Sequence, residues 1–420
     1  MQQYKKYKDS GIIWLGKIPE HWIVTTIRSL THLKSDKNHP DYEVLSVYRE
    51  YGVIKKNSRE DNHNVTSEDR ASYKAVNPTD LVINKMKAWQ GSMGISKFMG
   101  IVSPAYITCS INNDLVYGDY IHYLLRCSKY VGEYNRLSYG VRIGQWDMHY
   151  EDFKKIYIAL PPIEEQEKIA KFLDTKCRKI DEAIKQQEQT IELLKERQQA
   201  IIQRIVTRGI TSDIELKDSG VNWIGLIPKH WKVQKLKYAL NQVNIKLPTV
   251  GSELPYIGME NVESWTGKFI ESDSEVEGLA NYFNANNVLF GKLRPYLAKT
   301  YLPNHNGLCS TEFIVYDVLE NNASYIQRLL MTPEFINIVN SSTYGSKMPR
   351  ANSDFIGNIK IALPLPKEQK QIAKHLEIIA NKTEQTISLK KQEIDLLKEY
   401  KHSLINDVVT GKIKIGTNEK

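Results

Sequence analysis

Two pairs of short segments combine cations, aromatic rings and glycine in a pattern that suits contact with a polyanion. The first pair, 85–92 and 292–296, places two cations and one aromatic ring within five residues, directly after a β-like run. The second pair, 138–146 and 343–350, carries glycine beside basic residues. Lysine neutralises phosphate charge, glycine lets backbone N–H groups approach phosphates, and Arg or Gln can bond a base edge at two points. The candidate contact residues are Lys85, Lys87, Trp89, Gln90, Arg142, Gln145, Lys292, Arg294, Tyr296, Lys347 and Arg350.

Enzyme chemistry has little support in the sequence. The chain lacks the phosphate-loop, dinucleotide-binding, zinc-protease and nucleophile-elbow motifs. His21 and His230 each sit in a Pro-x-His-Trp turn without a nearby Cys, Asp or second His, so packing or a subunit contact explains them better than catalysis. The four cysteines form no C-x-x-C pair, which argues against a zinc site or a disulfide framework. We therefore expect no catalytic residue, no metal ligand and no cofactor in this chain.

The chain is a tandem repeat. Residues 9–22 return as residues 218–231 with nine of fourteen positions identical, and the Ile-Ala-Leu-Pro of 158–161 returns at 361–364. Weaker similarity links 81–86 to 288–293 and 120–121 to 325–326. A period near 205 residues is too long for a solenoid. Each copy thus consists of a Trp-rich lead, a divergent block and a long helix, and the polyanion-binding segments recur at equivalent places. A single such segment would be typical of any surface loop.

Two long helices must position these segments. Apolar residues follow a 4-3-4-3 spacing from Leu173 to Ile205 and from Leu376 to Val408, which predicts a coiled-coil seam. Proline precedes or opens each helix, and Gly209 and Gly411 close them. Such helices often join separate chains, but two per chain and polar residues at matched seam positions favour antiparallel pairing within one chain. The predicted pairing residues are Ile184, Ile191, Leu194, Ile201, Ile387, Ile394, Leu397 and Leu404.

The divergent blocks alternate short strands with helices. We predict strands at 44–47, 81–83, 106–108 and 156–158 and a helix over 120–137 in the first copy. The second copy repeats them as strands at 256–259, 288–290, 313–315 and 359–361 and a helix that begins at Tyr325. Each block is therefore an α+β domain with many exposed loops.

Composition and charge agree with this organisation. The 420 residues are 41% hydrophobic and 25% charged, which suits two or three globular domains. The chain has no apolar run of 18 residues and no secretory leader, so a cytoplasmic protein without a membrane segment is expected. The net charge is +8, of which the helical stretches 164–206 and 367–411 carry only +1. The basic charge lies in the divergent blocks and their flanks, where a polyanion would bind.

The doubled lead Gly-x-x-Trp-x-Gly-x-Ile-Pro-x-His-Trp and the doubled helix start Glu-Gln-x-x-Ile-Ala resemble the specificity subunit of type I restriction-modification systems. The resemblance covers essentially the whole chain. It implies an α+β fold in which two target-recognition domains are separated by two long helices that pair as an antiparallel coiled coil with pseudo-twofold symmetry. The implied segments are 1–160 (lead and first domain), 161–208 (central helix), 209–365 (second lead and domain) and 366–420 (C-terminal helix and tail).

The resemblance also implies partners. Such subunits bind double-stranded DNA, hold two methyltransferase subunits that use S-adenosylmethionine, and recruit restriction subunits that use ATP and Mg²⁺. Together with the repeat, this predicts two unlike half-sites, which Arg142 and Arg350 read in part. The length of the helices would set the spacer between the half-sites. The methyltransferase subunits would dock on the outer helix faces and the Trp-rich leads. The alternatives are a fused nuclease or methyltransferase of a related system, the DNA-recognition part of a related restriction enzyme, and a coiled-coil scaffold that binds only proteins. An RNA-binding role is weaker, because no aromatic RNA-module signature is present.

Overall fold

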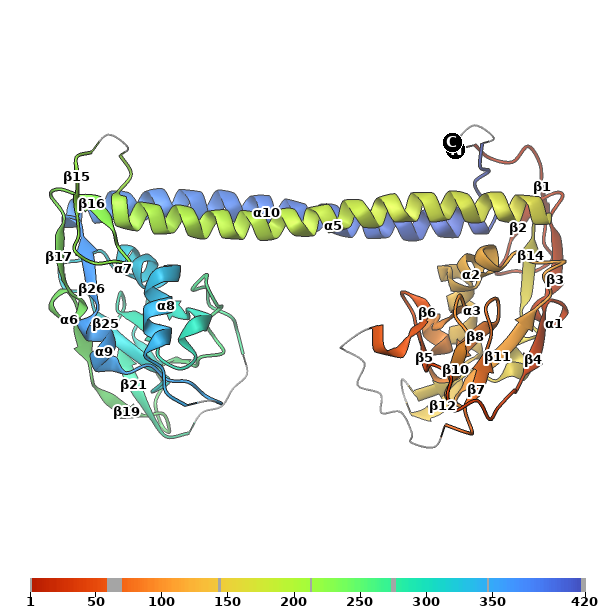
Figure 1. Ribbon diagram of the computed structural model, residues 1–420, viewed down its shortest axis with the longest axis horizontal. Helices are drawn as coiled ribbons and strands as arrows, with labels where there is room; N and C mark the ends of the chain where they lie inside the picture. Colours follow the sequence, from red (N-terminus) through yellow and green to blue (C-terminus); the bar gives the residue numbers. More distant parts are fainter. Residues whose placement is uncertain are drawn as a thin grey trace. The chain divides into compact units, whose positions relative to one another are not determined.

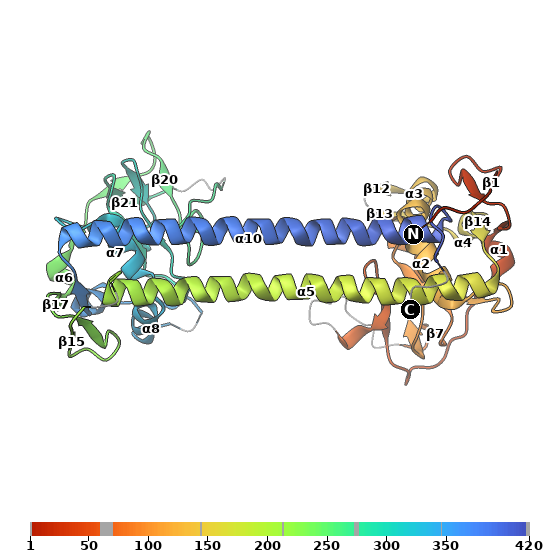
Figure 2. The same cartoon turned by 90° about the horizontal axis from the view of Figure 1, so that it is seen from above.

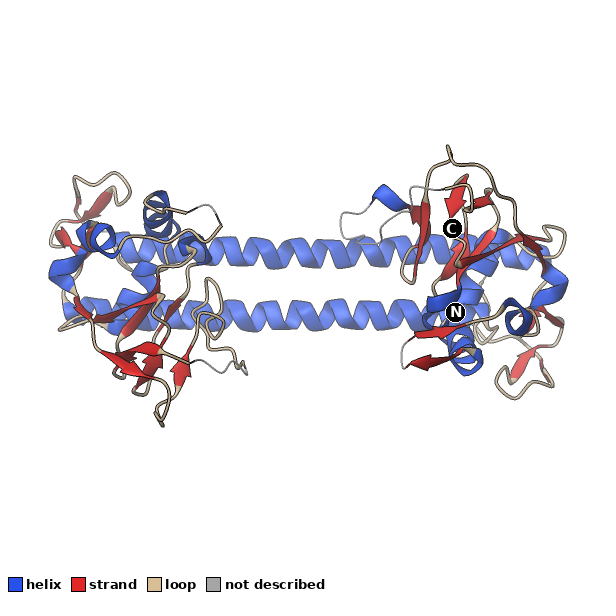
Figure 3. Ribbon diagram, turned by 90° about the horizontal axis from the view of Figure 1, so that it is seen from below, coloured by secondary structure: helices blue, strands red, loops and turns tan. Residues whose placement is uncertain are grey.

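The computed structural model describes residues 2–58, 70–142, 145–211, 214–272, 277–345 and 347–416. These residues form two compact units, Met1–Gln187 with Gln392–Lys420 and Glu188–Lys391. Each unit contains one lead, one divergent block and part of both long helices, with strands and short helices gathered beside the long ones (Figure 3). The boundary between the units passes through both long helices, whereas each of the four predicted segments keeps its long helix whole. The four-segment division therefore stays a prediction.

The first unit is built on a four-stranded antiparallel sheet in the order β4-β11-β8-β9 (Figure 1). Among the described residues, four two-stranded pairs, a lead hairpin and several short helices surround it. The sheet strands are β4 (Thr31–Lys34), β11 (Tyr106–Ile111), β8 (Leu81–Asn84) and β9 (Met93–Ile95). The remaining pairs are β1 (Tyr7–Asp9) with β2 (Lys17–Pro19), β3 (Ile23–Thr26) with β14 (Tyr157–Leu160), β5 (Leu45–Tyr48) with β6 (Gly52–Lys55), β7 (Lys74–Val76) with β10 (Gly100–Val102), and β12 (Tyr139–Arg142) with β13 (Gln145–Asp147). The helices are α1 (Ile27–Leu30), η1 (Lys56–Ser58), η2 (Lys85–Gln90), α2 (Gly118–Arg126), α3 (Ser128–Leu137) and α4 (Tyr150–Phe153).

The second unit repeats this plan with a larger strand layer. Its central sheet has the order β18-β25-β22-β23, and a second sheet has the order β19-β21-β24-β20. The strands are β15 (Leu216–Asp218), β16 (Leu226–Pro228), β17 (Lys232–Lys235), β18 (Asn241–Val243), β19 (Lys246–Pro248), β20 (Tyr256–Ile257), β21 (Leu279–Phe283), β22 (Val288–Gly291), β23 (Thr300–Tyr301), β24 (Gly307–Cys309), β25 (Phe313–Asp317) and β26 (Lys360–Leu363). The short helices are α6 (Leu236–Ala239), η3 (Pro295–Leu297), α7 (Ala323–Leu330), α8 (Pro333–Ser341) and α9 (Ser353–Asn358).

The inner strands β8 and β22 are buried on both faces, and this explains their apolar runs in the sequence. In β8, Leu81 and Ile83 belong to the main core, whereas Val82 belongs to a second cluster on the other face. In β22, Val288 and Phe290 face the main core and Leu289 faces the second cluster. Successive side chains of a strand point to opposite faces, so a continuous apolar run predicts burial on both sides. The predicted strands at 81–83 and 288–290 are confirmed.

The long helices are α5 (Ile163–Arg208) and α10 (Pro366–Val409), and they lie side by side in both units (Figures 1 and 2). In the first unit, Ile180 near the start of α5 packs in one cluster with Leu404 near the end of α10. In the second unit, Ile205 near the end of α5 packs in one cluster with Leu376 near the start of α10. Because the start of one helix meets the end of the other in each unit, the pairing is antiparallel, as predicted.

The predicted seam is the least exposed stripe of each helix. Ile191, Ile394 and Leu404 are buried, and the other five predicted pairing residues, Ile184, Leu194, Ile201, Ile387 and Leu397, are half-buried. Polar side chains at seam positions also form hydrogen bonds between the two helices within the first unit. Gln187 Nε2 donates to Glu393 Oε1 at 3.2 Å, and Lys401 Nζ lies 2.7 Å from the Asp181 carboxylate. Gly209 and Gly411 follow the helix ends with positive φ of 77° and 75°, which glycine adopts without strain.

Three local predictions are wrong. The helix predicted over 120–137 is two helices, because Cys127 takes an extended conformation and its carbonyl caps α3; in the second unit Pro333, which has no N–H, begins α8 after the same kind of break. The strand predicted at 256–259 ends at Ile257. The segment 138–146, where no strand was predicted, contributes to the hairpin β12-β13, and the short helix α4 separates it from β14.

Candidate nucleic-acid interface

The two predicted contact segments of the first unit lie together. The backbone N–H of Met148, which follows β13, donates to the carbonyl of Lys85 at 3.0 Å. The rings of Trp89 and Trp146 meet edge to face at 5.1 Å between centroids, and Lys85 Nζ lies 3.4 Å from Asp147 Oδ2. Segments 50 residues apart in the sequence therefore form one surface at the end of β8.

The second unit brings its two segments together by an equivalent backbone hydrogen bond. The backbone N–H of Ala351 donates to the carbonyl of Lys292 at 2.9 Å, as Met148 does to Lys85. The N–H of Arg294 donates to the carbonyl of Pro349 at 2.7 Å. The repeated contact shows that this surface belongs to the common fold of both copies.

The candidate residues differ in how accessible they are. Lys87, Arg294, Tyr296 and Lys347 are exposed, and Lys85, Trp89, Gln90 and Lys292 are half-buried. The backbones of Arg142 and Gln145 face each other across the β12-β13 hairpin, but their side chains lie outside the described part of the chain. Of the exposed candidates, Lys87 thus lies on the surface of the first unit, and Arg294, Tyr296 and Lys347 lie on that of the second.

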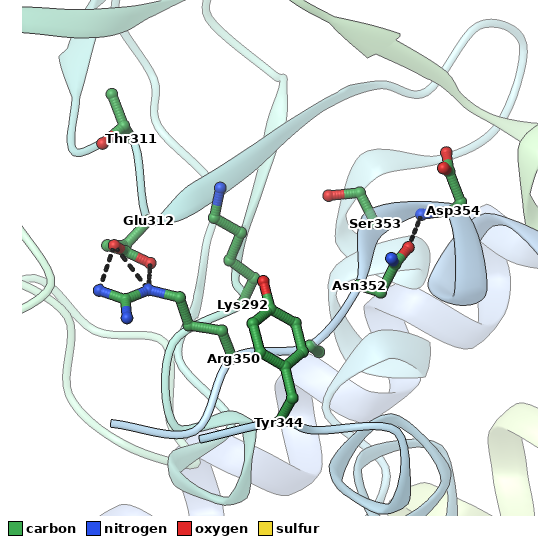
Figure 4. A pocket seen from close by; sticks show the side chains of 9 residues that line it. Lys292, Thr311, Glu312, Tyr344, Arg350, Asn352, Ser353 and Asp354 are labelled. Atoms are coloured by element: carbon green, nitrogen blue, oxygen red, sulfur yellow. Dashed lines mark hydrogen bonds and ion pairs between the residues drawn. The ribbon is translucent and has the colours of Figure 1, made fainter. Parts of the chain in front are cut away.

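Arg350 is held in place by an acidic partner that the sequence did not suggest. Its Nε lies 3.0 and 3.1 Å from the two carboxylate oxygens of Glu312, and its Nη2 lies 2.9 Å from Glu312 Oε1 (Figure 4). These hydrogen bonds raise the pKa of Arg350 above its usual value. Glu312 lies directly before β25 (Phe313–Asp317), a strand of the central sheet.

This ion pair forms one wall of a pocket of about 320 Å³ at the start of α9. Figure 4 shows the side chains of Lys292 and Tyr344 between the Arg350–Glu312 pair and the first residues of α9. Asn352 caps that helix, because its Oδ1 accepts hydrogen bonds from the backbone N–H of Asp354 at 2.7 Å and of Phe355 at 3.2 Å. The pocket is lined by Lys292, Thr311, Glu312, Tyr344, Arg350, Ala351, Asn352, Ser353 and Asp354.

The structure corrects the alignment of the two copies in this region. The sequence comparison aligned segment 138–146 with segment 343–350, so that Trp146 stood opposite Arg350. In the structure, Tyr139 pairs with Asp147 and Tyr344 pairs with Arg350, so Arg350 is equivalent to Asp147. The first copy has two extra residues in the hairpin, and these hid the equivalence.

The repeated motifs fasten each lead to the start of a long helix. His21 Nε2 lies 2.7 Å from Glu165 Oε2, and His230 Nε2 lies 2.8 Å from Glu368 Oε2. Glu165 also accepts a hydrogen bond from the Tyr4 hydroxyl at 2.5 Å. The histidines therefore have a packing role, as predicted. Sequence reasoning missed their acidic partners, Glu165 and Glu368. The signal was present, because the Pro-x-His-Trp lead and the Glu-Gln helix start recur together in both copies.

The glutamine that follows each of these glutamates is buried and fully bonded. Gln166 donates to the carbonyls of Leu115 and Pro161, both at 3.0 Å, and accepts from the N–H of Tyr117 at 2.9 Å. Gln369 repeats this pattern with Asn321, Pro364 and Asn322 at 2.8, 3.0 and 2.8 Å. Both glutamines tie the long helix to the loop before α2 or α7, so the Glu-Gln motif serves the fold.

The described ranges contain no cluster of three or more His, Cys, Asp or Glu side chains placed to hold a metal ion. All four cysteines are buried and free. None of the described helices is both long and apolar enough to cross a membrane.

Comparison with known proteins gives matches over both copies. The family described as the type I restriction modification DNA specificity domain matches residues 19–193 and again residues 232–398. The type I restriction enzyme MjaVIII specificity subunit of Methanocaldococcus jannaschii is 24% identical over 365 residues, which cover 81% of this chain and 80% of that protein. The EcoDI specificity subunit of Escherichia coli is 23% identical over 312 residues, 69% of each protein.

Solved structures share the fold. A chain from a structure of complex assembly and conformational transition in the type I R-M system superposes with a TM-score of 0.69 at 13% identity, covering 94% of this chain and 99% of that one. The HsdS subunit from Thermoanaerobacter tengcongensis superposes with a TM-score of 0.55 at 13% identity, covering 94% and 98%.

Proposed function

Because the chain belongs to the family of type I restriction-modification DNA specificity subunits, which it matches once in each copy, we propose that each unit reads one half of a bipartite DNA site. The paired segments at the end of β8 and of β22 form the reading surface. The observation that carries this proposal is their recurrence, with the same backbone contact, on two units whose exposed side chains differ. Unlike surfaces read unlike sequences, so the two half-sites differ and the whole site is asymmetric.

Charge supports DNA as the partner. Nearly all of the net positive charge lies outside the long helices, and Lys87, Arg294 and Lys347 are exposed at the paired segments. Cations at such positions neutralise phosphates and release counterions, which makes binding strongly dependent on salt. Specificity would then come from the side chains that reach base edges.

Specificity subunits of type I systems work with DNA and with the other subunits of their complex. The finer composition is part of the proposal. This chain binds two methyltransferase subunits, which supply S-adenosylmethionine chemistry on adenine, and restriction subunits, which supply ATP- and Mg²⁺-dependent translocation and cleavage. It contributes recognition without a catalytic residue or cofactor of its own, and it acts in the cytoplasm.

The long helices set the spacer in this proposal. Each is a continuous helix, of 46 residues in α5 and 44 in α10. At 1.5 Å per residue, helices of this length measure roughly 65–70 Å, which is the scale of a split DNA site with an unread gap. The length of the paired helices would then decide how many base pairs separate the half-sites.

Sequencing of methylated sites in a host that expresses this chain with its modification subunits tests the proposal. The expected result is one asymmetric motif made of two short defined parts and an undefined gap. A salt series of duplex binding by the assembled complex should show a steep loss of affinity. A continuous motif would contradict the bipartite reading. Absence of duplex binding would instead favour a scaffold that binds only proteins.

A further inference from the structure

We propose that Arg350 reads a guanine in the half-site of the second unit and that Glu312 is the positioning residue that orients it. This inference rests on the proposed function and names the base contacted at one place. Two observations lead to it: Glu312 uses only some of the N–H donors of the guanidinium, and the Arg350–Glu312 pair carries no net charge.

The donors of Arg350 are only partly used. A guanidinium has five N–H donors in a rigid plane. Glu312 occupies the Nε edge and one side of Nη2, and among the described residues none accepts a hydrogen bond from Nη1. The unused N–H groups of Nη1 and Nη2 lie at the far end of the plane, and this end can bond O6 and N7 of guanine at two points.

The backbone of Arg350 is fixed as well as its side chain. Its N–H donates to the carbonyl of Tyr344 at 3.1 Å, and its carbonyl accepts from the N–H of Tyr344 at 3.2 Å. It also forms a bridge with Leu293. A side chain anchored at both ends loses little further rotational freedom on binding, so more of its hydrogen-bond energy is available for discrimination. The side chain is still 37% exposed, so its outer end is accessible.

The carboxylate makes a base a better target than a phosphate. Glu312 cancels the charge of Arg350, and a pair without net charge gains little from a phosphate. The directional hydrogen bonds of the guanidinium remain, and these suit the acceptor edge of guanine. Exposed Lys347, three residues earlier and without an ion pair among the described residues, is the kind of cation that suits phosphate.

The test begins with the methylated motif of the wild-type complex. The second unit's half-site is expected to contain a guanine, on either strand, that is essential for methylation. A bipartite motif whose half-sites both lack an essential guanine would overturn this inference and leave the proposed function standing. A motif that is not bipartite would overturn both.

Duplexes with 7-deazaguanine then probe the contact directly, because this base pairs normally but lacks the N7 acceptor. The wild-type complex should lose roughly tenfold or more in affinity when one guanine of this half-site is replaced. The Arg350→Ala complex should bind the two duplexes equally, because alanine has no donor for the N7 acceptor. A variant that still discriminates against 7-deazaguanine at that position would show that another residue reads it.

Glu312→Gln separates a positioning role from a merely structural one. The variant should lose discrimination at the same guanine, while its affinity for non-specific duplex stays equal or rises, since a negative charge near DNA has been removed. Glu312→Asp should restore part of the discrimination. A purely structural role would lower specific and non-specific binding together, along with the melting temperature, and would overturn the assignment of Glu312. Lys347→Ala is the matched control and should weaken binding to all duplexes alike.

Discussion

Asp147 and Arg350 occupy the same position in the two units and carry opposite charges. Each pairs across its hairpin with a tyrosine, Tyr139 or Tyr344, and each precedes the residue that donates to the carbonyl of Lys85 or Lys292. Asp147 faces a lysine of its own unit, whereas Arg350 faces Glu312. One fold therefore presents an acceptor in one unit and a donor in the other. Acceptors suit the cytosine amino group and donors suit guanine, so the two half-sites should differ at this point.

Arg142→Ala should relax the half-site of the first unit only. Arg142 lies in the hairpin that borders the Trp89–Trp146 contact, and loss of a two-point base contact costs about 1–3 kcal/mol. Sequencing of methylated sites checks this, because one half of the motif should become degenerate while the other stays defined. Equal weakening at every sequence would assign Arg142 to phosphate instead.

Insertion of one heptad after Ile191 and one after Ile394 should lengthen the unread spacer. Both residues are buried on the helix seam, and seven residues preserve that seam while adding about 10.5 Å, or roughly three base pairs. The methylated motif of the double insertion is the measurement, and both half-sites should be retained. Insertion of four residues is the control, since it rotates the seam and should impair assembly. An unchanged gap after the heptad insertions would exclude the helices as the ruler.

The first unit should lose stability in mild acid because of His122. This side chain is half-buried, its Nδ1 accepts from the N–H of Ile95 at 3.2 Å, and its Nε2 faces the guanidinium of Arg126. Burial, together with the positive charges of Arg126 and Lys97, lowers the pKa of His122 from 6.5 to about 3. The folded state binds the proton more weakly than the unfolded state, so stability is complete above pH 6.5 and is lost as the pH falls towards 3. At pH 5 the loss should be on the order of 2 kcal/mol.

Chemical denaturation at pH 7.5 and pH 5 measures this effect. Gln327 stands at the equivalent position of the second unit and donates to the carbonyl of Thr300 at 3.1 Å, so glutamine is compatible with this site. His122→Gln should therefore remove most of the pH dependence of the first unit. If the variant and the wild type lose the same stability between the two pH values, the acid sensitivity lies elsewhere.

Glu165→Gln and Glu368→Gln should each destabilise their own unit. Each carboxylate joins the histidine of a lead to the start of a long helix, and Glu368 also accepts from Trp231 Nε1 at 3.1 Å. A partly exposed charged hydrogen bond of this kind is worth about 1–2 kcal/mol after screening. Urea denaturation provides the measurement, and exposed Glu164→Gln is the control. A change no larger than that of Glu164→Gln would mean that the lead is held by apolar packing alone.

Methyltransferase docking should depend on the exposed outer residues of the helices. Trp22 and Trp231 are fully buried and anchor the leads in the core, so docking by the leads, which stays a prediction, would use their other residues. Leu193 and Leu389 are each 64% exposed within the second unit. Leu193→Lys and Leu389→Lys should reduce retention of the modification subunit in a pull-down without lowering the melting temperature. Glu192→Lys on the same helix is the control, and retention equal to that of the control would exclude this face.

The sequence predicted those features that depend on local pattern. The seam from Leu173 to Ile205 and the strand around Val82 follow from spacing and apolar runs, which the structure confirms. The break at Cys127 has no proline or glycine to announce it, so periodicity alone favoured one helix. The partners of His21 and Arg350 lie 144 and 38 residues away, and only the folded chain brings such residues together.

The sequence predicted which segments form the candidate surface, but not the contacts that join them or the residues that are equivalent in the two units. Recurrence between the copies identified 85–92 and 138–146 as candidate contact segments, but nothing in the spacing indicated that the N–H of Met148 joins the two. Two extra residues in one hairpin concealed the equivalence of Asp147 and Arg350. The base contacts depend on side-chain placement, which has no periodic signal in the sequence.

The two units differ in how their chain is assembled. The second unit is continuous from Glu188 to Lys391, whereas the first requires Gln392–Lys420 to cover its long-helix seam and core. During synthesis, Leu173 and Ile180 therefore leave the ribosome some two hundred residues before Leu404 and Val408 arrive to pack with them. The first unit is therefore synthesised first but completed last, after the second unit has had time to fold. A nascent chain stalled near residue 391 would expose the uncovered apolar seam of the first unit to chaperones or to another copy of the chain.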